Sequence, residues 1–422
     1  MLSSLVQLLA LSAIITPSFA FPAFANSRFD KDFLKARSPA NTFDTNVTKR
    51  QTGSDPFLNL PTLTIPGILA PVQVIYPGSP TSGRVEIPDS SHPYQDPPSG
   101  AQRGACPGLN ILANYGYISR SGITNVGELL FAMQQVFGFA PDLAGVLTAF
   151  TLKGMTDPTT LRLSIGGTDS RTSGLLSFLL GGQVPGLFAK ESHNKYERDG
   201  SFAHTDSFFR PDGTTRTFNA TNWAKRVTTA NSFSSGLFGP TWNGQARFEQ
   251  YNECIATNPQ CSWLVVSQIL FYGAGHLPWA TMMSTGPDGL QEPATQAKIQ
   301  TAFGISQQGS TFVKVPEQLP PSSDGKWYRR ATGYTVAEVV QGAIDSFLMH
   351  PVAFGANSGS TNSFIVQGTQ LDADNISVQS VGCLLVAEAS ENIPVSLLSI
   401  QNDLLALLGA LVAPAKASLA CA

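Results

Sequence analysis

The sequence is poor in charge and has no basic stretch. Only 13% of its 422 residues are Asp, Glu, Lys or Arg, and the net charge is −3. This is about half the usual share of charged residues, roughly 25%. Proteins that bind nucleic acid carry clustered Lys and Arg, so the composition argues against a nucleic-acid partner. Low charge with 38 Gly and 29 Pro suits an extracellular protein.

Several motifs of common enzyme and metal sites are missing. The chain has no Cys-x-x-Cys and no His-x-x-x-His pair, so a zinc site is unsupported. It has no Gly-x-Ser-x-Gly, which argues against a serine hydrolase of the α/β class. No repeat of 20 to 50 residues is present, so a solenoid or propeller is not expected.

Long hydrophobic runs are also missing. No segment after the N-terminus reaches about 18 uninterrupted apolar residues, and 402–420 is interrupted and too short, so no membrane partner is expected. Residues 1–20 have an apolar centre and end in Ser18-Phe19-Ala20, a small-x-small cleavage site. They are predicted to be a signal peptide of a secreted protein. The alternative is a membrane anchor, which Pro17 and the short apolar run oppose.

Two segments follow the signal peptide. Residues 21–50 are charged and end in the dibasic pair Lys49-Arg50, so they form a possible propeptide whose removal would leave Gln51 first. The alternative is an ordinary exposed basic pair. Residues 51–103 are rich in proline, which breaks helices and central strands. We expect an extended arm over the surface of the domain.

Residues 104–422 are predicted to form one large, mainly α-helical domain with long loops. Apolar residues recur at helical spacing in 125–154, where Pro141 starts a second helix. Similar spacing occurs in 333–351, where Pro351 stops the helix, and in 393–414. Alternating patterns typical of strands are scarce.

The five cysteines leave one without a partner. Cys254 and Cys261 are close enough in sequence to bridge a short loop, and Cys383 and Cys421 flank the last helical segment and could tie it down. These pairings leave Cys106 single. A spare thiol in a secreted protein is either buried and inert or has a chemical task.

The segment around Cys106, "ACPGLNILANYGYISRSG", resembles the proximal segment of the fungal haem-thiolate peroxidases, the family of chloroperoxidase and the unspecific (aromatic) peroxygenases. The family's first proline is Ala105 here, and its histidine is Tyr115. The resemblance implies a haem-thiolate peroxidase fold with haem b as the cofactor and Cys106 as the axial ligand of the iron. The positions that match the family pattern are Cys106, Pro107, Leu109, Asn110, Leu112, Ala113, Asn114, Gly116, Arg120 and Gly122.

A second segment, 196–209, resembles the family's Glu-(Gly/His)-Asp-x-Ser-x-(Ser/Thr)-Arg-x-Asp. The resemblance implies that Glu197, Ser201 and the backbone carbonyl of Arg198 hold Mg²⁺ or a similar cation beside a haem propionate. Glu197 and Ser201 are four residues apart, which predicts one face of a helical turn. This chain has His204 where the family has arginine.

A third segment departs from the family on the distal side. Peroxygenases place a glutamate seven residues after a charge-stabilising arginine, and the glutamate transfers the proton that peroxide cleavage requires. In "NPQCSWLVVSQILFYGAGHLPW" these two positions are Ser267 and Ala274. His276 is the nearest titratable residue and is the acid–base candidate, although on a helix it points about 200° away from Ala274. We therefore expect haem binding with slow peroxide activation.

The resemblance predicts a secreted peroxidase or peroxygenase that uses hydrogen peroxide to oxidise or oxygenate small apolar or aromatic substrates. Two alternatives remain open: a haem-binding member with lost or redirected activity, and an interaction protein that reuses the fold without haem. The N-glycosylation motifs at Asn46, Asn219 and Asn375 predict surface positions on a glycosylated chain.

Overall fold

The computed structural model describes residues 55–421 except 175–176, 178–181, 195–197, 392 and 394. The predicted signal peptide and propeptide, with Asn46, lie outside the described residues, as does the predicted ligand Glu197. The described part belongs to one unit of the chain, residues 51–422.

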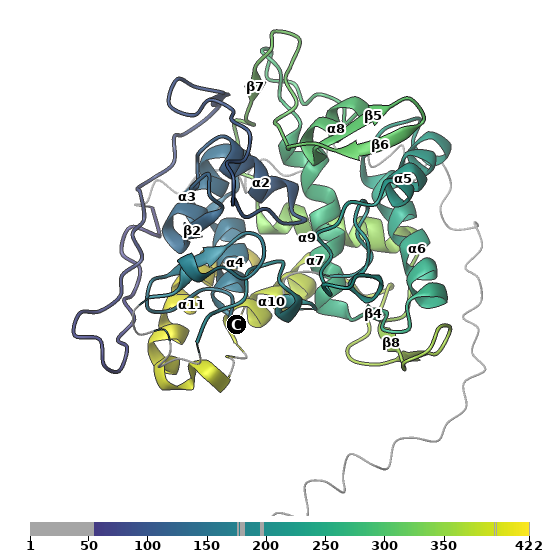
Figure 1. Ribbon diagram of the computed structural model, residues 1–422. Helices are drawn as coiled ribbons and strands as arrows, with labels where there is room; N and C mark the ends of the chain where they lie inside the picture. Colours follow the sequence, from purple (N-terminus) through teal and green to yellow (C-terminus); the bar gives the residue numbers. More distant parts are fainter. Residues whose placement is uncertain are drawn as a thin grey trace, which may run out of the picture. The chain divides into compact units, whose positions relative to one another are not determined.

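The described chain is mainly helical, as predicted, and Figure 1 shows how its elements are arranged. Its α-helices are α2 (Pro107–Asn114), α3 (Val126–Phe137), α4 (Pro141–Leu152), α5 (Ala220–Phe233), α6 (Pro240–Thr257), α7 (Val265–Leu277), α8 (Gln296–Phe303), α9 (Val336–Met349), α10 (Val378–Ser390) and α11 (Gln401–Leu419).

The strands are short and form small antiparallel sheets, paired β1–β7, β2–β3, β4–β8–β9 and β5–β6. They are β1 (Glu86–Ile87), β2 (Ile123–Asn125), β3 (Arg162–Ser164), β4 (Ser262–Trp263), β5 (Ile305–Gln308), β6 (Thr311–Lys314), β7 (Trp327–Tyr328), β8 (Gly355–Asn357) and β9 (Phe364–Val366).

Helices are present in all three segments where helical spacing predicted them, and they pack around an apolar core. Helix α7 packs along α9, and α4 packs along α11, with α10 in contact with all four (Figure 1). Asn125 caps α3 by accepting from the Glu128 amide, and Thr335 and Glu338 form a reciprocal capping box on α9. Pro141 starts α4 as expected.

The last helix is longer than the sequence suggested. Helical spacing predicted a helix within 393–414, and α11 continues through Pro414 to Leu419. By length and composition alone, one segment of the described chain, Leu397–Leu419, is long and apolar enough to cross a membrane. Its apolar side, with Leu407 and Leu411 fully buried, packs against α4 and α10, as a core helix does.

The proline-rich arm is extended, as predicted, but it also contributes to the core. Between residues 55 and 103 the only regular element is β1, which pairs with β7, a strand more than 200 residues later in the sequence. Phe57, Leu63 and Ile87 of the arm are all buried. The arm is therefore an integral part of the fold.

Two contacts hold the arm against the helices. A Cβ atom at Gly127, near the start of α3, would lie 1.9 Å from the carbonyl oxygen of Ile75, so only glycine lets the arm approach this closely. The Thr64 amide donates a 2.6 Å hydrogen bond to the Asp403 carboxylate at the start of α11.

Candidate active site

Cys106 is a free cysteine at the N-terminus of α2, and it faces a cavity of about 250 Å³. Pro107 occupies the first helical position, where a missing N–H costs nothing. The amides of Gly108 and Leu109 donate to the sulfur. Burial raises the pKa of the Cys106 thiol, and the nearby Glu317 carboxylate raises it further. A thiolate here is therefore stabilised by the helix amides but needs a metal ion to offset its burial.

The asparagines of the Cys106 segment fix the loop that carries the thiol. Asn110 accepts a 3.1 Å hydrogen bond from the Gly104 amide and donates one of 2.9 Å to the Gly104 carbonyl. Its side chain also donates to the Glu317 carboxylate at 2.9 Å. Asn114 donates to the Glu317 backbone carbonyl at 2.9 Å. The spacing of the two asparagines on α2 thus positions the turn before Cys106.

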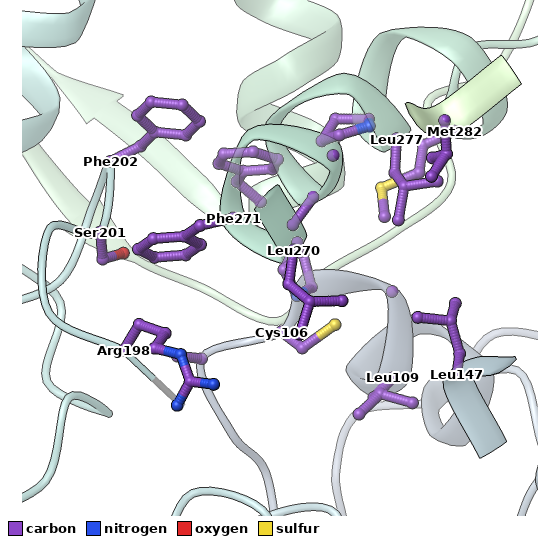
Figure 2. Close-up of a pocket in the computed structure, with 18 of the residues that line it drawn as sticks. Cys106, Leu109, Leu147, Arg198, Ser201, Phe202, Leu270, Phe271, Leu277 and Met282 are labelled. Carbon is purple, nitrogen blue, oxygen red and sulfur yellow. The ribbon is translucent and has the colours of Figure 1, made fainter. Parts of the chain in front are cut away.

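The cavity in front of Cys106 is apolar at one end and polar at the other (Figure 2). The figure shows Arg198 and Ser201 on one side of the Cys106 sulfur, and Leu147, Leu277 and Met282 on the other. The polar and titratable residues that line the cavity besides Cys106 are Arg198, Ser201, His204, Thr215, Arg247, Ser267 and Glu317. A ligand with an anionic edge and a hydrocarbon edge fits such a cavity.

The loop with the predicted cation ligands lies at the polar end. Ser201 Oγ and His204 Nδ1 are 3.0 Å apart and share a hydrogen bond. Burial, together with the positive charge of Lys314, lowers the pKa of His204 to about 3, so the imidazole is neutral near pH 7. The predicted helical turn is wrong for the described part, because residues 198–206 form a loop in which Gly200 has φ 77°.

The cation site is only partly within the described residues. Ser201 and Arg198 line the cavity, whereas Glu197 lies outside the described part. Among the described residues, no group of three His, Cys, Asp or Glu side chains could hold a metal ion. The predicted Mg²⁺ site therefore stays a prediction.

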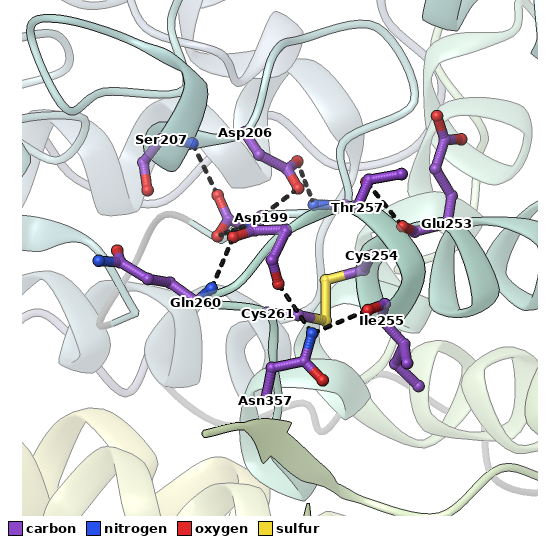
Figure 3. The surroundings of a disulfide bond; sticks show 12 residues. Asp199, Asp206, Ser207, Glu253, Cys254, Ile255, Thr257, Gln260, Cys261 and Asn357 are labelled. Carbon is purple, nitrogen blue, oxygen red and sulfur yellow. Dashed lines mark hydrogen bonds between the residues drawn. A yellow bond between two sulfur atoms is a disulfide. The ribbon is translucent and has the colours of Figure 1, made fainter. Parts of the chain in front are cut away.

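Two acids of this loop, Asp199 and Asp206, accept hydrogen bonds that hold the loop in place (Figure 3). Asn258 donates 3.1 Å hydrogen bonds to the carboxylates of both Asp199 and Asp206. Asp206 also accepts from the Gly200 amide at 2.8 Å. Burial raises the pKa of Asp206 to about 7, and the neighbouring Asp199 contributes to the rise. The Cys254–Cys261 disulfide closes the turn that carries Asn258.

Helix α7 forms the wall of the cavity opposite α2. Ser267 and Ala274, which occupy the positions of the family's arginine and glutamate, both line the cavity. His276 does not line it. The ring lies behind α7, where a Cβ atom on Gly342 would come within 2.0 Å of its Nδ1 atom, and it contacts the Trp279 ring at 4.3 Å.

His276 is thus buried away from Cys106, and its Nδ1 atom has no hydrogen-bond partner. Burial lowers the pKa of His276 to about 3, and the charge of Arg330 adds to the effect. The imidazole is therefore neutral near pH 7. An acid–base role for His276 remains a prediction, and the structure does not bring this residue together with Cys106, Arg198 and Ser201.

Arg247 is the most buried charge at the cavity, with 1% of its surface exposed. Its guanidinium lies between two rings, 3.9 Å from the Phe202 centroid and 4.0 Å from the Phe271 centroid. It donates to the Gly200 carbonyl at 2.9 Å and to the Gln250 side-chain oxygen at 3.0 Å. Its Nε atom is buried without a hydrogen-bond partner.

Sequence reasoning did not single out Arg247 or Glu317, and it treated His204 only as a departure from the family. Arg247 lies in α6 and Glu317 follows β6, so neither belongs to a motif near Cys106 in sequence. His204 had one usable signal, its position three residues after Ser201. The other two are brought to the cavity by tertiary packing alone.

A second cavity of about 660 Å³ adjoins the first. Phe150, Arg198 and Ser267 line both cavities, so these three side chains mark the junction. The second cavity is more polar, with Lys153, Asp157, Glu191 and Glu388 in its walls.

Both predicted disulfides are present, Cys254–Cys261 and Cys383–Cys421. The second joins α10 to the residue two positions after the end of α11.

Of the predicted glycosylation sites, Asn375 is exposed. Asn219 is half-buried and caps α5 by accepting from the Asn222 amide at 3.0 Å, so a glycan there would have to leave this cap intact.

Comparison with known proteins places the Cys106 segment within a matched domain. Residues 92–332 match the family described as "Peroxidase, family 2". The chain is 30% identical over 275 residues to an aromatic peroxidase, fscJ, of Fusarium equiseti, covering 63% of this chain and 60% of that protein.

Two further relatives give similar alignments. The dothistromin biosynthesis peroxidase dotB of Dothistroma septosporum is 30% identical over 292 residues, covering 68% of this chain and 66% of that protein. An aromatic peroxygenase of Cyclocybe aegerita is 28% identical over 289 residues, covering 68% of this chain and 69% of that protein. The chain therefore matches slightly less than two thirds of the length of the Fusarium and Dothistroma proteins.

Proposed function

The chain belongs to peroxidase family 2, and on that premise we propose that it is a secreted haem-thiolate enzyme that uses hydrogen peroxide to oxidise or oxygenate small organic substrates. The observation that carries this proposal is the free thiol of Cys106, which faces an apolar cavity from the first turn of a helix. The relatives named as aromatic peroxidase and aromatic peroxygenase support aromatic substrates.

The residues at the cavity fit haem b. The Gly108 and Leu109 amides donate to the Cys106 sulfur, which suits a thiolate ligand. Cys106 would hold the haem iron, and a haem with a thiolate ligand would supply the chemistry that cleaves the O–O bond of a peroxide. Leu109, Leu147, Leu277 and Met282 provide the apolar wall that a porphyrin requires. These side chains also exclude water and bind an apolar substrate.

Ser201, Glu197 and the carbonyl of Arg198 are proposed to hold Mg²⁺ or a similar cation at the polar end. Ser201 contributes a hydroxyl at the cavity wall, which supports the proposal. Metal analysis of Glu197→Gln against the parent tests it. Less bound Mg²⁺ in the variant is expected, and equal metal content in both proteins would contradict the site.

The wall formed by α7 is proposed to make peroxide activation slow. Proton transfer between the two peroxide oxygens needs a titratable group in reach, and Ser267 and Ala274 cannot act as an arginine and a glutamate do. His276 is the remaining acid–base candidate of α7, and it would have to leave its packing against Gly342 to act. Turnover by the parent is therefore expected to be weak.

Spectroscopy of the purified protein tests the haem proposal. The ferrous CO adduct is expected to show the strongly red-shifted Soret band of thiolate ligation, and Cys106→Ala is expected to lose it. The matched control is Cys254→Ala with Cys261→Ala, which removes a buried sulfur pair away from the cavity and should keep the band. A histidine-type spectrum, or a well-folded parent without haem, would overturn the proposal.

Two alternatives make different predictions in the same experiments. A haem-binding protein with lost activity would give the thiolate spectrum without peroxide-dependent oxidation of a model aromatic substrate. The lost arginine and glutamate positions of α7 favour this reading over full activity. An interaction protein without haem would show neither. Secretion is tested separately, by recovering the chain from the culture medium with residues 1–20 removed.

A further inference from the structure

Arg247 is a buried charge for which the described residues provide no counterion. Moving a cation out of water is costly unless an anion or several hydrogen bonds offset the loss. Arg247 is 1% exposed, and its two described hydrogen bonds go to neutral oxygens, those of Gly200 and Gln250. Among the described residues, the acidic group that acts on Arg247 electrostatically is the Tyr272 phenol. A phenol is neutral near pH 7, and burial raises the pKa of Tyr272 further, so it does not offset the charge of Arg247.

Arg226, a second buried arginine, has the carboxylate partner that Arg247 lacks among the described residues. Arg226 lies 3.0 Å from the Glu249 carboxylate, and it also donates to the Ala246 carbonyl at 2.9 Å. Arg226 does not line the cavity, whereas Arg247 does. Among the described residues, no ion pair of Arg247 with a carboxylate is present. The anion that balances Arg247 is therefore expected from a molecule in the cavity.

The rings around Arg247 limit where that anion can bind. Phe202 and Phe271 cover both faces of the guanidinium, so only its edge is left to bind a ligand. Nη1 is already used by Gly200 and Gln250, and Nε is enclosed by protein. Nη2 is therefore the donor that makes no hydrogen bond to a described residue. A carboxylate accepts hydrogen bonds in the plane of a guanidinium, which is the geometry that this edge offers.

We propose that Arg247 binds a carboxylate in the cavity and that this carboxylate is a propionate of the haem. The inference rests on the proposed function, and it assigns the orientation of the cofactor. Ser201 and Phe202 would then flank the propionate edge, and Leu147 and Leu277, on the other side of Cys106, would contact the hydrocarbon edge (Figure 2). Because haem has two propionates, a cation held near Ser201 is compatible with this assignment.

The first test is the rate at which haem leaves the purified holoprotein for an excess of apomyoglobin. Arg247→Met and Arg247→Gln are expected to lose haem at least about tenfold faster than the parent, because a buried ion pair loses one partner. Arg247→Lys keeps the charge and should stay closer to the parent. The matched control is Arg226→Met, which removes a buried arginine outside the cavity and should leave the rate of haem loss unchanged.

Unfolding of the haem-free forms supplies a second measurement. Without haem, Arg247 is an unbalanced buried charge, so Arg247→Met is expected to unfold at the same or a higher denaturant concentration than the parent. A purely structural arginine would give the reverse. Arg226→Met breaks a complete ion pair and is expected to be less stable in both forms.

The outcomes separate the proposal from its rivals. Equal rates of haem loss in the parent, Arg247→Met and Arg247→Gln would overturn it, as would equal losses in Arg247→Lys and Arg247→Met. If haem loss is unchanged while KM rises for a benzoate-type substrate but not for its methyl ester, the carboxylate belongs to the substrate and the propionate assignment is wrong. A parent without any haem would refute the proposed function instead.

Discussion

The side-chain amide of Asn110 donates a 2.9 Å hydrogen bond to the carboxylate of Glu317, 207 residues later in the chain. This bond joins the helix that starts at Cys106 to the loop after β6. It holds a buried negative charge near the thiol, and Lys314 forms an ion pair with the same carboxylate. The environment of Cys106 is thus set by a residue from a distant part of the sequence.

The first prediction concerns this charge. Glu317→Gln removes the negative charge but keeps an oxygen that accepts from Asn110, so the pKa of the Cys106 thiol is expected to fall. Alkylation of the haem-free protein by iodoacetamide, followed from pH 6 to pH 10, measures the change. Glu388→Gln is the control, because Glu388 pairs with Lys153 and does not line the Cys106 cavity. An unchanged alkylation profile in Glu317→Gln would contradict the prediction.

The second prediction restores an acid–base group to the wall of α7. Ala274→Glu with Ser267→Arg places a carboxylate and a guanidinium where both positions line the cavity. General acid–base catalysis of this kind contributes roughly 10²–10⁴-fold, so peroxide-dependent oxidation of a model aromatic substrate is expected to rise on that order. Ala274→Gln with Ser267→Arg has a similar shape but cannot transfer the proton, and it should remain as slow as the parent.

The third prediction concerns His276. Its ring packs behind α7 and outside the cavity, so His276→Gln is expected to leave the rate of the peroxide reaction unchanged. The unfolding midpoint should change, because the variant disturbs the packing against Gly342 and Trp279. Stopped-flow mixing with peroxide makes the measurement. A large loss of rate with an intact haem spectrum would show that His276 is the acid–base group after all.

The fourth prediction ranks the two disulfides. The chain-entropy model gives about 2–3 kcal/mol for a loop as short as Cys254–Cys261 and about 4 kcal/mol for the 38-residue separation of Cys383–Cys421. Each pair is replaced by serines and the variants are unfolded in urea. Loss of Cys383–Cys421 should therefore lower the free energy of unfolding more than loss of Cys254–Cys261. Peptide mapping under non-reducing conditions verifies the pairing first. A larger loss from the short loop would show that Asn258 and its two acids depend on that disulfide.

The fifth prediction follows from the acid pair behind Ser201. Asp206 keeps its proton to about pH 7 in the folded protein, but its ordinary pKa is 3.8. Its favourable contribution to the free energy of unfolding is therefore fully present below pH 3.8 and is lost as the pH rises through about 7.

Asp206→Asn should remove this part of the pH dependence. The difference in unfolding free energy between parent and variant, measured from pH 4 to pH 8, cancels the other titrating groups. The parent is expected to lose stability relative to the variant as the pH rises. Asp212→Asn, at an exposed carboxylate whose pKa is lowered, should not show this trend. A difference that stays constant with pH would contradict the assignment.

Local patterns predicted the parts of the molecule that depend on neighbouring residues. Helical spacing located α3, α4 and α9, and the odd cysteine count separated Cys106 from the two pairs. The cavity was only partly predictable, because Arg247 and Glu317 reach it from separate elements. The pattern of α6 contains no signal that one of its arginines is buried between two rings.

Two departures from the local sequence pattern have physical causes. Proline normally ends a helix because it lacks an N–H group and crowds the preceding turn. In α11 the packing against α4 and the disulfide at Cys421 offset this cost, so the helix continues past Pro414. The loop that begins at Arg198 was predicted as a helical turn. Gly200 instead adopts a positive φ, and its amide donates a hydrogen bond to the Asp206 carboxylate.

The N-terminal arm has a consequence for the order in which the chain folds. Its residues leave the ribosome before the helical part of the domain, yet β1 pairs with strand β7 near residue 327, and Thr64 bonds to Asp403. These partners are synthesised more than 200 residues later, and long-range pairing of this kind slows folding. The arm is therefore expected to dock late and to expose Phe57 and Leu63 while it waits. Chaperones that bind the unfinished chain would then be expected to contact this arm.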